Sequence, residues 1–195
     1  MIDHDLLLIS DEVYSELTYE TRHCAPATVG DLRERTITLN GFSKAYAMTG
    51  WRIGYFCAPK ELLDAALKIH QYVMLCAPVM GQVGALEAIR SAEEDKNSMV
   101  NEYRFRRNMF VAGLNRIGLP CHIPEGAFYA FPSVKETGLS DEEFAERLLK
   151  EQRVAVVPGS VFGEGGEDHI RCAYAVSRQE LNSALNSMET FIKTL

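Results

Sequence analysis

Residues 36–59 read TITLNGFSKAYAMTGWRIGYFCAP, and both ends of this stretch have the composition of β-strands. β-Branched and aromatic residues are frequent in residues 36–42 and 52–59. Between the two runs lies Lys44, and Arg52 begins the second run. Strands that alternate with helices along a chain are typical of α/β proteins. With the helices predicted on either side of these strands, the sequence therefore predicts an α/β fold. The remaining question is whether Lys44 is a solvated cation or a covalent catalyst.

Strand and helix patterns alternate along the first half of the chain. The apolar run LLLIS (6–10) predicts a strand buried on both faces of a parallel sheet. Because nothing precedes this strand, we expect the chain to begin inside a domain whose earlier part is missing. Apolar residues at helical spacing predict one helix from residue 59 to about 75 and another that begins at Pro78. The second helix is expected to direct its bulky apolar residues inward, namely Val79, Val83, Leu86 and Ile89.

The pattern changes in the second half. The charged segment EEDKN (93–97) is expected to be a solvated helix face or a joint, and the helix after it ends at Gly118. Strands are predicted at residues 126–132, 154–159 and 169–175. Two helices are expected to begin at capping boxes, formed by Ser140 with Glu143 and by Ser177 with Glu180. We therefore predict two lobes, residues 1–97 and 98–195.

Composition excludes several classes of function. The net charge of −7 and the isoelectric point near 5.3 argue against a surface for nucleic acid or anionic lipid. The five cysteines form no CxxC pair and no Cys/His cluster has zinc spacing, so we expect free thiols and no metal site. No signal peptide and no membrane-spanning run is visible. We expect a soluble, cytoplasmic protein.

Polar side chains follow the first two predicted strands at the point where each strand ends. Asp11 comes directly after LLLIS, with Tyr14 three residues later, and Ser43 and Lys44 come directly after TITLNGF. The carboxyl ends of parallel strands meet at one edge of a sheet, where ligands bind in open α/β folds. If the two strands are parallel, the four side chains share this edge.

These residue types together suit one cofactor. A lysine in a partly desolvated pocket near another cation, as Lys44 would be near Arg52, can form a Schiff base. The Arg52 guanidinium can bind a phosphate with two hydrogen bonds, and Ser43 can add a hydroxyl. A carboxylate such as Asp11 can hold a ring nitrogen protonated, and a phenol such as Tyr14 can tune a ring oxygen. These are the requirements of pyridoxal phosphate.

The motifs resemble those of a known family. SDEVY (10–14) followed by NGFSKAYAMTGWRIGY (40–55) resembles the class I aminotransferases of the fold-type-I pyridoxal-phosphate superfamily. Further family-like segments follow in family order: PEGAFYAFP (124–132), VAVVPGSVFG (154–163) and HIRCAYA (169–175). The resemblance implies the later part of a mostly parallel-sheet large domain and an α+β small C-terminal domain. The N-terminal half of the family, with part of its cofactor site, is absent from the sequence.

The resemblance also implies a role for each candidate residue. Lys44 would be the Schiff-base lysine and would move the substrate's Cα proton. Asp11 would pair with the pyridine nitrogen of pyridoxal phosphate, and Tyr14 would bind its 3-oxygen. Ser43 and Arg52 would bind its phosphate. The implied reaction is transfer of an amino group between an L-amino acid and a 2-oxo acid, in a homodimer.

Arg171 completes the implied set, because the resemblance places it on the substrate α-carboxylate. Arg178 is a weaker candidate for this role. Aspartate or an aromatic amino acid is the leading substrate hypothesis. One alternative is a C–S lyase of the same superfamily. Another is a folded but inactive chain that lacks half of the cofactor-binding residues, and this is the expectation for the isolated 195 residues.

Each candidate also has a purely structural explanation. Lys44 alone would be a solvated cation, and Asp11 could cap a helix N-terminus. Tyr14 could be a half-buried core aromatic and Ser43 a turn residue. Arg52 could form a structural ion pair, and Arg171 could likewise pair with a buried acid.

Overall fold

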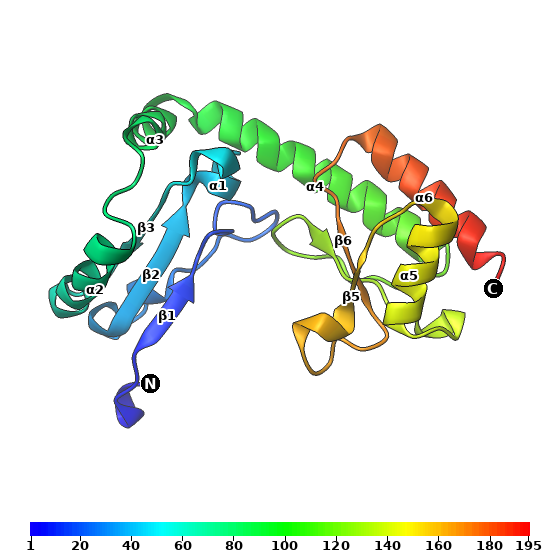
Figure 1. The fold of residues 1–195 in the computed structure, drawn as a ribbon, viewed down its shortest axis with the longest axis horizontal. Helices are drawn as coiled ribbons and strands as arrows, with labels where there is room; N and C mark the ends of the chain where they lie inside the picture. Colours follow the sequence, from blue (N-terminus) through cyan, green and yellow to red (C-terminus); the bar gives the residue numbers. More distant parts are fainter. The chain divides into compact units, whose positions relative to one another are not determined.

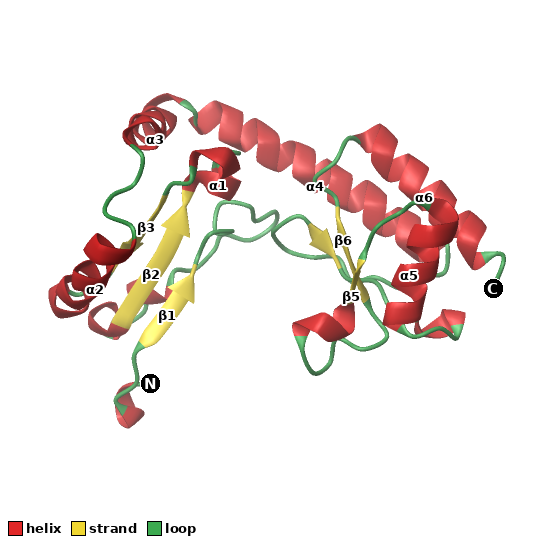
Figure 2. Ribbon diagram, viewed as in Figure 1, coloured by secondary structure: helices red, strands yellow, loops and turns green.

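The computed structural model describes all residues, 1–195, and forms two compact units, Met1–Val100 and Asn101–Leu195 (Figure 1). The boundary falls inside α4 (Glu93–Arg116), so one continuous helix contributes to both units. Each unit has its own three-stranded sheet and its own helices (Figure 2). This mixture confirms the predicted α/β class. No helix is long and apolar enough to cross a bilayer.

The sheet of unit 1 has the order β1-β2-β3. β1 (Leu8–Asp11) runs parallel to β2 (Thr36–Gly41), which pairs antiparallel with β3 (Gly54–Cys57). The predicted strands are present, but burial of the first strand on both faces was a wrong prediction. Ile9 is 66% exposed, and the side chains of β1 alternate between half-buried and exposed, so one face of this strand is open.

The other elements of unit 1 are short helices and turns. Its α-helices, besides the first part of α4, are α1 (Phe42–Ala45), α2 (Lys60–Val73) and α3 (Val79–Ser91). Its 3-10 helices are η1 (Ile2–His4), η2 (Pro26–Thr28), η3 (Leu32–Arg35) and η4 (Thr49–Trp51). α1 follows β2 without a connecting loop, which places residues 42–45 directly at the end of that strand.

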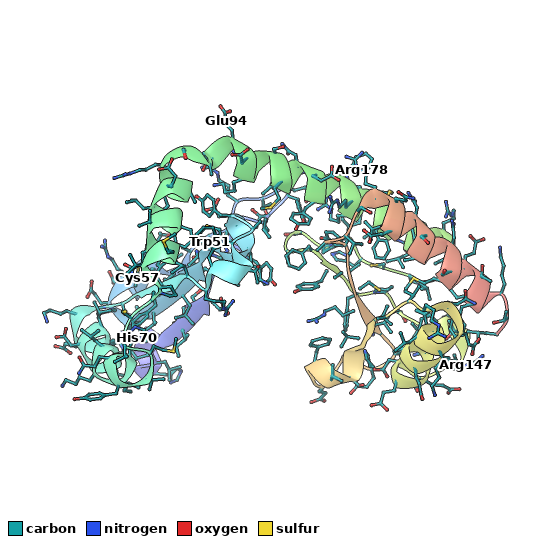
Figure 3. The ribbon with its side chains drawn as sticks, turned by 45° about the horizontal axis from the view of Figure 1, so that its top comes forward. Trp51, Cys57, His70, Glu94, Arg147 and Arg178 are labelled. Carbon is teal, nitrogen blue, oxygen red and sulfur yellow. The ribbon has the colours of Figure 1, made fainter.

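Helix α3 turns its small residues inward, which contradicts the prediction that its bulky residues face the core. Gly81 and Ala85 are its buried residues, and a Cβ atom at Gly81 would lie 2.6 Å from the Ile53 side chain. Trp51 (labelled in Figure 3) contributes a backbone oxygen to the same contact. Because the helix approaches this surface so closely, only small residues fit there. The bulky residues point away from it and are exposed: Val79, Val83, Leu86 and Ile89.

Unit 2 is an α+β domain, as predicted for the C-terminal part. Its antiparallel sheet has the order β4-β6-β5. The strands are β4 (Tyr129–Ala130), β5 (Val157–Pro158) and β6 (Ile170–Ala173). The helices, besides the rest of α4, are η5 (Lys135–Thr137), α5 (Asp141–Gln152), η6 (Gly159–Phe162) and α6 (Arg178–Ile192). The core includes an edge-to-face pair, Phe144 and Phe191, with ring centroids 5.2 Å apart.

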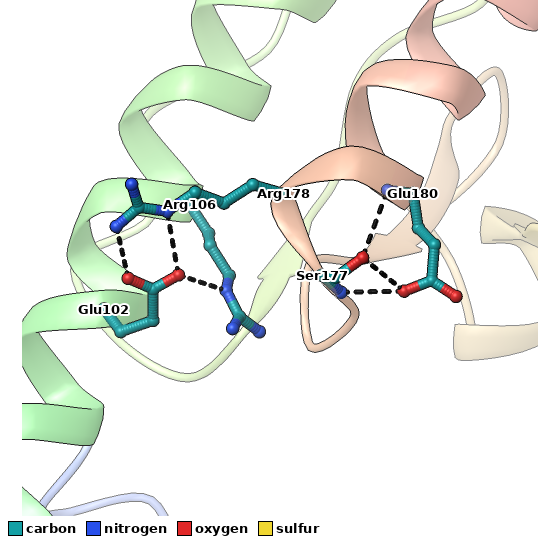
Figure 4. A network of polar contacts seen from close by, with 5 residues as sticks. All are labelled: Glu102, Arg106, Ser177, Arg178 and Glu180. Carbon is teal, nitrogen blue, oxygen red and sulfur yellow. Dashed lines mark hydrogen bonds and ion pairs between the residues drawn. The ribbon is translucent and has the colours of Figure 1, made fainter.

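Both serines expected to cap helices do so. Ser177 and Glu180 form a complete capping box at the start of α6 (Figure 4). At α5 the Ser140 hydroxyl accepts a hydrogen bond from the Glu143 N–H at 3.1 Å. A side-chain acceptor at this position satisfies a backbone donor that the helix itself leaves unpaired.

Beside this cap, Glu102 on α4 bridges two arginines (Figure 4). Its carboxylate accepts hydrogen bonds from Arg178 Nε at 3.0 Å and from Arg106 Nε at 2.8 Å. These hydrogen bonds, the Arg178 contacts first and then Arg106, lower the pKa of Glu102 from 4.5 to about 2. The carboxylate therefore stabilises the folded state only while it is ionised.

We expect acid to remove this contribution as the pH falls from about 4.5 to about 2. The sign follows from the lowered pKa in the folded state: the stabilisation is fully present above the unfolded pKa and is lost as the pH falls through the folded pKa. The measurement is the free energy of unfolding in denaturant at several pH values and low salt. In Glu102→Gln, the free energy of unfolding should fall less steeply as the pH is lowered from about 4.5 to about 2. Glu136→Gln, which removes an exposed carboxylate without arginine partners, should leave this fall unchanged.

Candidate active site

Two strands of unit 1 carry candidate residues to one edge of the sheet. β1 and β2 are parallel, as assumed, with Asp11 opposite Leu39 (Figure 1). The backbone N–H of Glu12 donates to the Leu39 carbonyl at 2.8 Å, so the segment after β1 starts in register with the end of β2. Asp11 is the last residue of β1, and Lys44 lies in α1, three residues after β2 ends, so both residues lie at the carboxyl ends of neighbouring strands.

Lys44 is held next to Tyr14. Its Nζ lies 5.9 Å from the centroid of the Tyr14 ring, and both side chains are half-buried. The one-turn helix α1 is anchored by Phe42 and Ala45, which are buried. Because the anchoring residues flank Ser43 and Lys44, these two polar side chains stay at the surface of the unit. A half-buried lysine at the end of a strand presents a primary amine that can form a Schiff base with a carbonyl compound.

Asp11 does not cap a helix, because β1 is followed directly by a turn and not by a helix. One of its carboxylate oxygens, Oδ1, accepts a hydrogen bond from the Val13 N–H at 3.2 Å, which shapes the turn after the strand. The residue is exposed. Its carboxylate is therefore both oriented by the backbone and accessible to a ligand.

Arg52 ends a tightly folded loop. Its Nη1 donates to the Thr49 carbonyl at 2.9 Å, and the Thr49 hydroxyl donates to the Ser43 carbonyl at 2.9 Å. Arg52 has φ +56° and Ala47 has φ +53°, a left-handed backbone that costs about 1–3 kcal/mol for each residue of this kind. Arg52 is exposed and forms no ion pair, so it is not a structural ion-pair partner. The strained loop links the two residues expected to bind phosphate.

Arg171 belongs to unit 2, whereas the other five candidates belong to unit 1. It lies on β6, and its guanidinium carbon is 4.6 Å from the centroid of the Tyr129 ring and 4.4 Å from that of Phe162. The rival Arg178 is already bound by the Glu102 carboxylate. Arg171 is therefore the better candidate for a carboxylate ligand.

Comparison with known proteins shows the family of the chain. The model of the family described as aminotransferase class I and II matches residues 1–188. The chain belongs to this aminotransferase family. Its membership also accounts for the order of the motifs, from the segment around Asp11 to the strand that carries Arg171.

Individual aminotransferases are similar along almost the whole chain. The putative aminotransferase YugH of Bacillus subtilis is 54% identical over 189 residues, which are 97% of this chain and 49% of that protein. The aspartate aminotransferase of Pyrococcus abyssi is 43% identical over 195 residues, 98% of this chain and 50% of that protein. The crystal structure of the aromatic aminotransferase from Pyrococcus horikoshii superposes with a TM-score of 0.96 at 42% identity, over 99% of this chain and 52% of that one. The chain spans about half the length of the relatives it matches, and these similarities confirm the predicted fold type.

Within this aminotransferase chain, sequence patterns did not reveal two buried charges near the candidate site. Glu12 is 6% exposed, and its Oε2 lies 3.0 Å from His23 Nε2. Glu12 directly follows Asp11, and the alternation of side chains along a strand could have suggested that it points to the opposite face. Its other oxygen, Oε1, is buried without a hydrogen-bond partner.

The second buried charge is Lys96, which is 9% exposed. Its Nζ is 2.7 Å from Glu16 and 2.9 Å from Glu93, and it lies 5.9 Å from the Tyr46 ring centroid. The prediction that residues 93–97 form a solvated face was therefore wrong for Lys96. Its partner Glu16 is 80 residues away in the chain, a contact that no local pattern reports.

The candidate residues fit pyridoxal phosphate chemically. Lys44 offers an amine for the aldehyde, and Arg52 and Ser43 offer a cation and a hydroxyl for the phosphate. Asp11 offers a carboxylate for the protonated ring nitrogen, and Tyr14 a phenol for the ring oxygen. No group of three or more His, Cys, Asp or Glu side chains in the structure could hold a metal ion.

Proposed function

We propose that this chain carries the lysine, phosphate-binding and carboxylate-binding residues of a pyridoxal-phosphate-dependent aminotransferase, a transferase of nitrogenous groups. The observation that carries the proposal is the position of Lys44, beside Tyr14 and at the sheet edge where Asp11 ends its strand. A lysine in these surroundings, in a chain of the aminotransferase class I and II family, is best explained as the cofactor-binding lysine.

Four residues of unit 1 are proposed to orient the cofactor. Arg52 and Ser43 hold the phosphate, Asp11 keeps the ring nitrogen protonated, and Tyr14 donates to the ring 3-oxygen. When bound, pyridoxal phosphate supplies an electron-withdrawing ring that stabilises negative charge at the substrate Cα. The carboxylate of Asp11 supports this role because it favours the cationic form of the ring.

Two residues are proposed to act on the substrate. Lys44 would hold pyridoxal phosphate through its amine and, once free, would accept the substrate Cα proton as a general base and return a proton as a general acid. Arg171 binds the substrate α-carboxylate through the planar fork of its guanidinium. The proposed substrates are small L-amino acids and 2-oxo acids.

The substrate is proposed to be aspartate or an aromatic amino acid. In support, the relatives include proteins named aspartate aminotransferase and aromatic-amino-acid aminotransferase. The test incubates the chain with pyridoxal phosphate and a panel of amino acids, with and without a 2-oxo acid acceptor. Amino transfer that requires the acceptor supports the proposal. Release of ammonia and pyruvate without an acceptor would favour the C–S lyase, and the absence of both reactions would favour an inactive chain.

We also propose that the protein is a homodimer. In support, α2 and α3 expose several large apolar side chains, as protein interaction surfaces do: Leu67, Ile69, Tyr72, Val73, Val79, Met80 and Val83. Sedimentation equilibrium should detect the dimer, and Tyr72→Glu should weaken it at least about tenfold. Leu149→Glu, on α5, is the control for a charge added at an exposed apolar position. A monomer at all concentrations would refute the proposal.

A further inference from the structure

The Arg171 guanidinium is flanked by aromatic rings from two different segments. Tyr129 pairs with Ala173 across β4 and β6, so Tyr129 and Arg171 lie diagonally on one face of the sheet. Phe162 comes from the end of η6, after β5. Both ring centroids are well inside the ~6 Å within which a cation is attracted to an aromatic face. No side-chain carboxylate is paired with Arg171.

Phe162 is held in place by the packing of η6. The first residue of η6, Gly159, donates its N–H to the His169 carbonyl at 2.8 Å, and a Cβ atom there would lie 2.1 Å from the Gly166 oxygen. The backbone of η6 is thus pressed against the loop that leads into β6. Phe162 itself is 50% exposed, so its ring covers Arg171 without forming part of the core.

A buried carboxylate fixes the same segment from the other side. Asp141, at the start of α5, accepts a hydrogen bond through Oδ2 from the Ser160 N–H at 2.9 Å. Burial alone would raise the pKa of Asp141, but the hydrogen bonds it accepts, led by that from Ser160, hold the pKa below its usual value. The carboxylate stays ionised at neutral pH, and η6 stays anchored two residues before Phe162.

We propose that Tyr129 and Phe162 are positioning residues that hold the Arg171 guanidinium in one orientation, ready to bind a single carboxylate. The inference rests on the proposed carboxylate-binding role of Arg171. It adds that the two rings restrict the guanidinium before a ligand binds. An arginine side chain has several rotatable bonds, and it loses conformational entropy when it is fixed by binding a ligand. Two rings that already restrict the guanidinium reduce this loss, and they keep its charge unpaired with protein carboxylates.

The test is an NMR titration of the full chain with acetate at neutral pH, followed on the Arg171 Nε–Hε signal. Phe162→Leu and Tyr129→Leu are each expected to weaken acetate binding about three- to tenfold. Phe162→Tyr and Tyr129→Phe, which keep a ring, should bind like the wild type. The rest of the amide spectrum of unit 2 should be unchanged, which separates a positioning effect from unfolding.

A matched control is available at a second arginine. Arg178 lies 3.7 Å from the centroid of the Phe105 ring but is anchored by Glu102, so Phe105→Leu should leave the Arg171 titration unchanged. Acetate affinity within about 1.5-fold of wild type in both leucine variants would overturn the inference. Failure of the proposed function gives a different result, because the wild-type Arg171 signal would then not respond to acetate at all.

Discussion

Replacing Lys44 with alanine is expected to abolish covalent capture of pyridoxal phosphate by the chain. The reaction requires a primary amine that can attack the aldehyde, and Lys44 presents one beside Tyr14. Ser43 and Arg52 are proposed to hold the phosphate near this amine, and hydrogen bonds to a charged group contribute ~1.5–3 kcal/mol. Capture at Lys44 should therefore exceed capture at an ordinary surface lysine by about tenfold or more.

In the measurement, borohydride reduces the imine between the lysine and pyridoxal phosphate to a stable amine, and mass spectrometry then identifies the modified peptide. Lys60, an exposed lysine paired with Asp64, is the internal reference, and Lys60→Ala is the control variant. Lys44→Arg keeps the charge and should lose the label as completely as Lys44→Ala. Equal labelling of both lysines, or a normal yield in Lys44→Ala, would show that Lys44 is not the cofactor-binding residue.

The sequence predicted the local parts of this site because they depend on short-range rules. The apolar run before Asp11 and the β-branched run before Lys44 specify two strands, and side chains just past strand ends collect at one edge of a parallel sheet. The helix starts at Ser140 and Ser177 were predicted for the same reason, since a cap involves residues only three positions apart.

The failures arose where packing between distant segments decides the result. Periodicity shows that α3 has a bulky face and a small-residue face, but not that Ile53 approaches closely enough to require the small one. In the same way, no local pattern indicates that Lys96 pairs with Glu16. The rings beside Arg171 come from segments that only the folded sheet brings together.

Replacing Gly159 with alanine is expected to destabilise unit 2 by about 3 kcal/mol or more, and to lower its unfolding temperature by roughly 12 °C or more. The new methyl group would lie 2.1 Å from the Gly166 oxygen and 2.8 Å from the His169 oxygen. Both are backbone atoms, so they cannot yield by a change of rotamer. Gly50→Ala should change stability by less than about 0.5 kcal/mol, because a Cβ atom added at Gly50 would meet no atom within 4 Å apart from its chain neighbours.

The same substitution also tests how unit 2 presents Arg171. If η6 must move away from β6 to admit the methyl group, Phe162 moves with it, and the Arg171 Nε–Hε signal should shift under conditions where unit 2 is still folded. Thermal unfolding and the amide spectrum together separate the two effects. Wild-type stability in Gly159→Ala would mean that the contact between η6 and the loop before β6 relaxes easily. The orientation of Phe162 would then have to depend on the Asp141–Ser160 hydrogen bond instead.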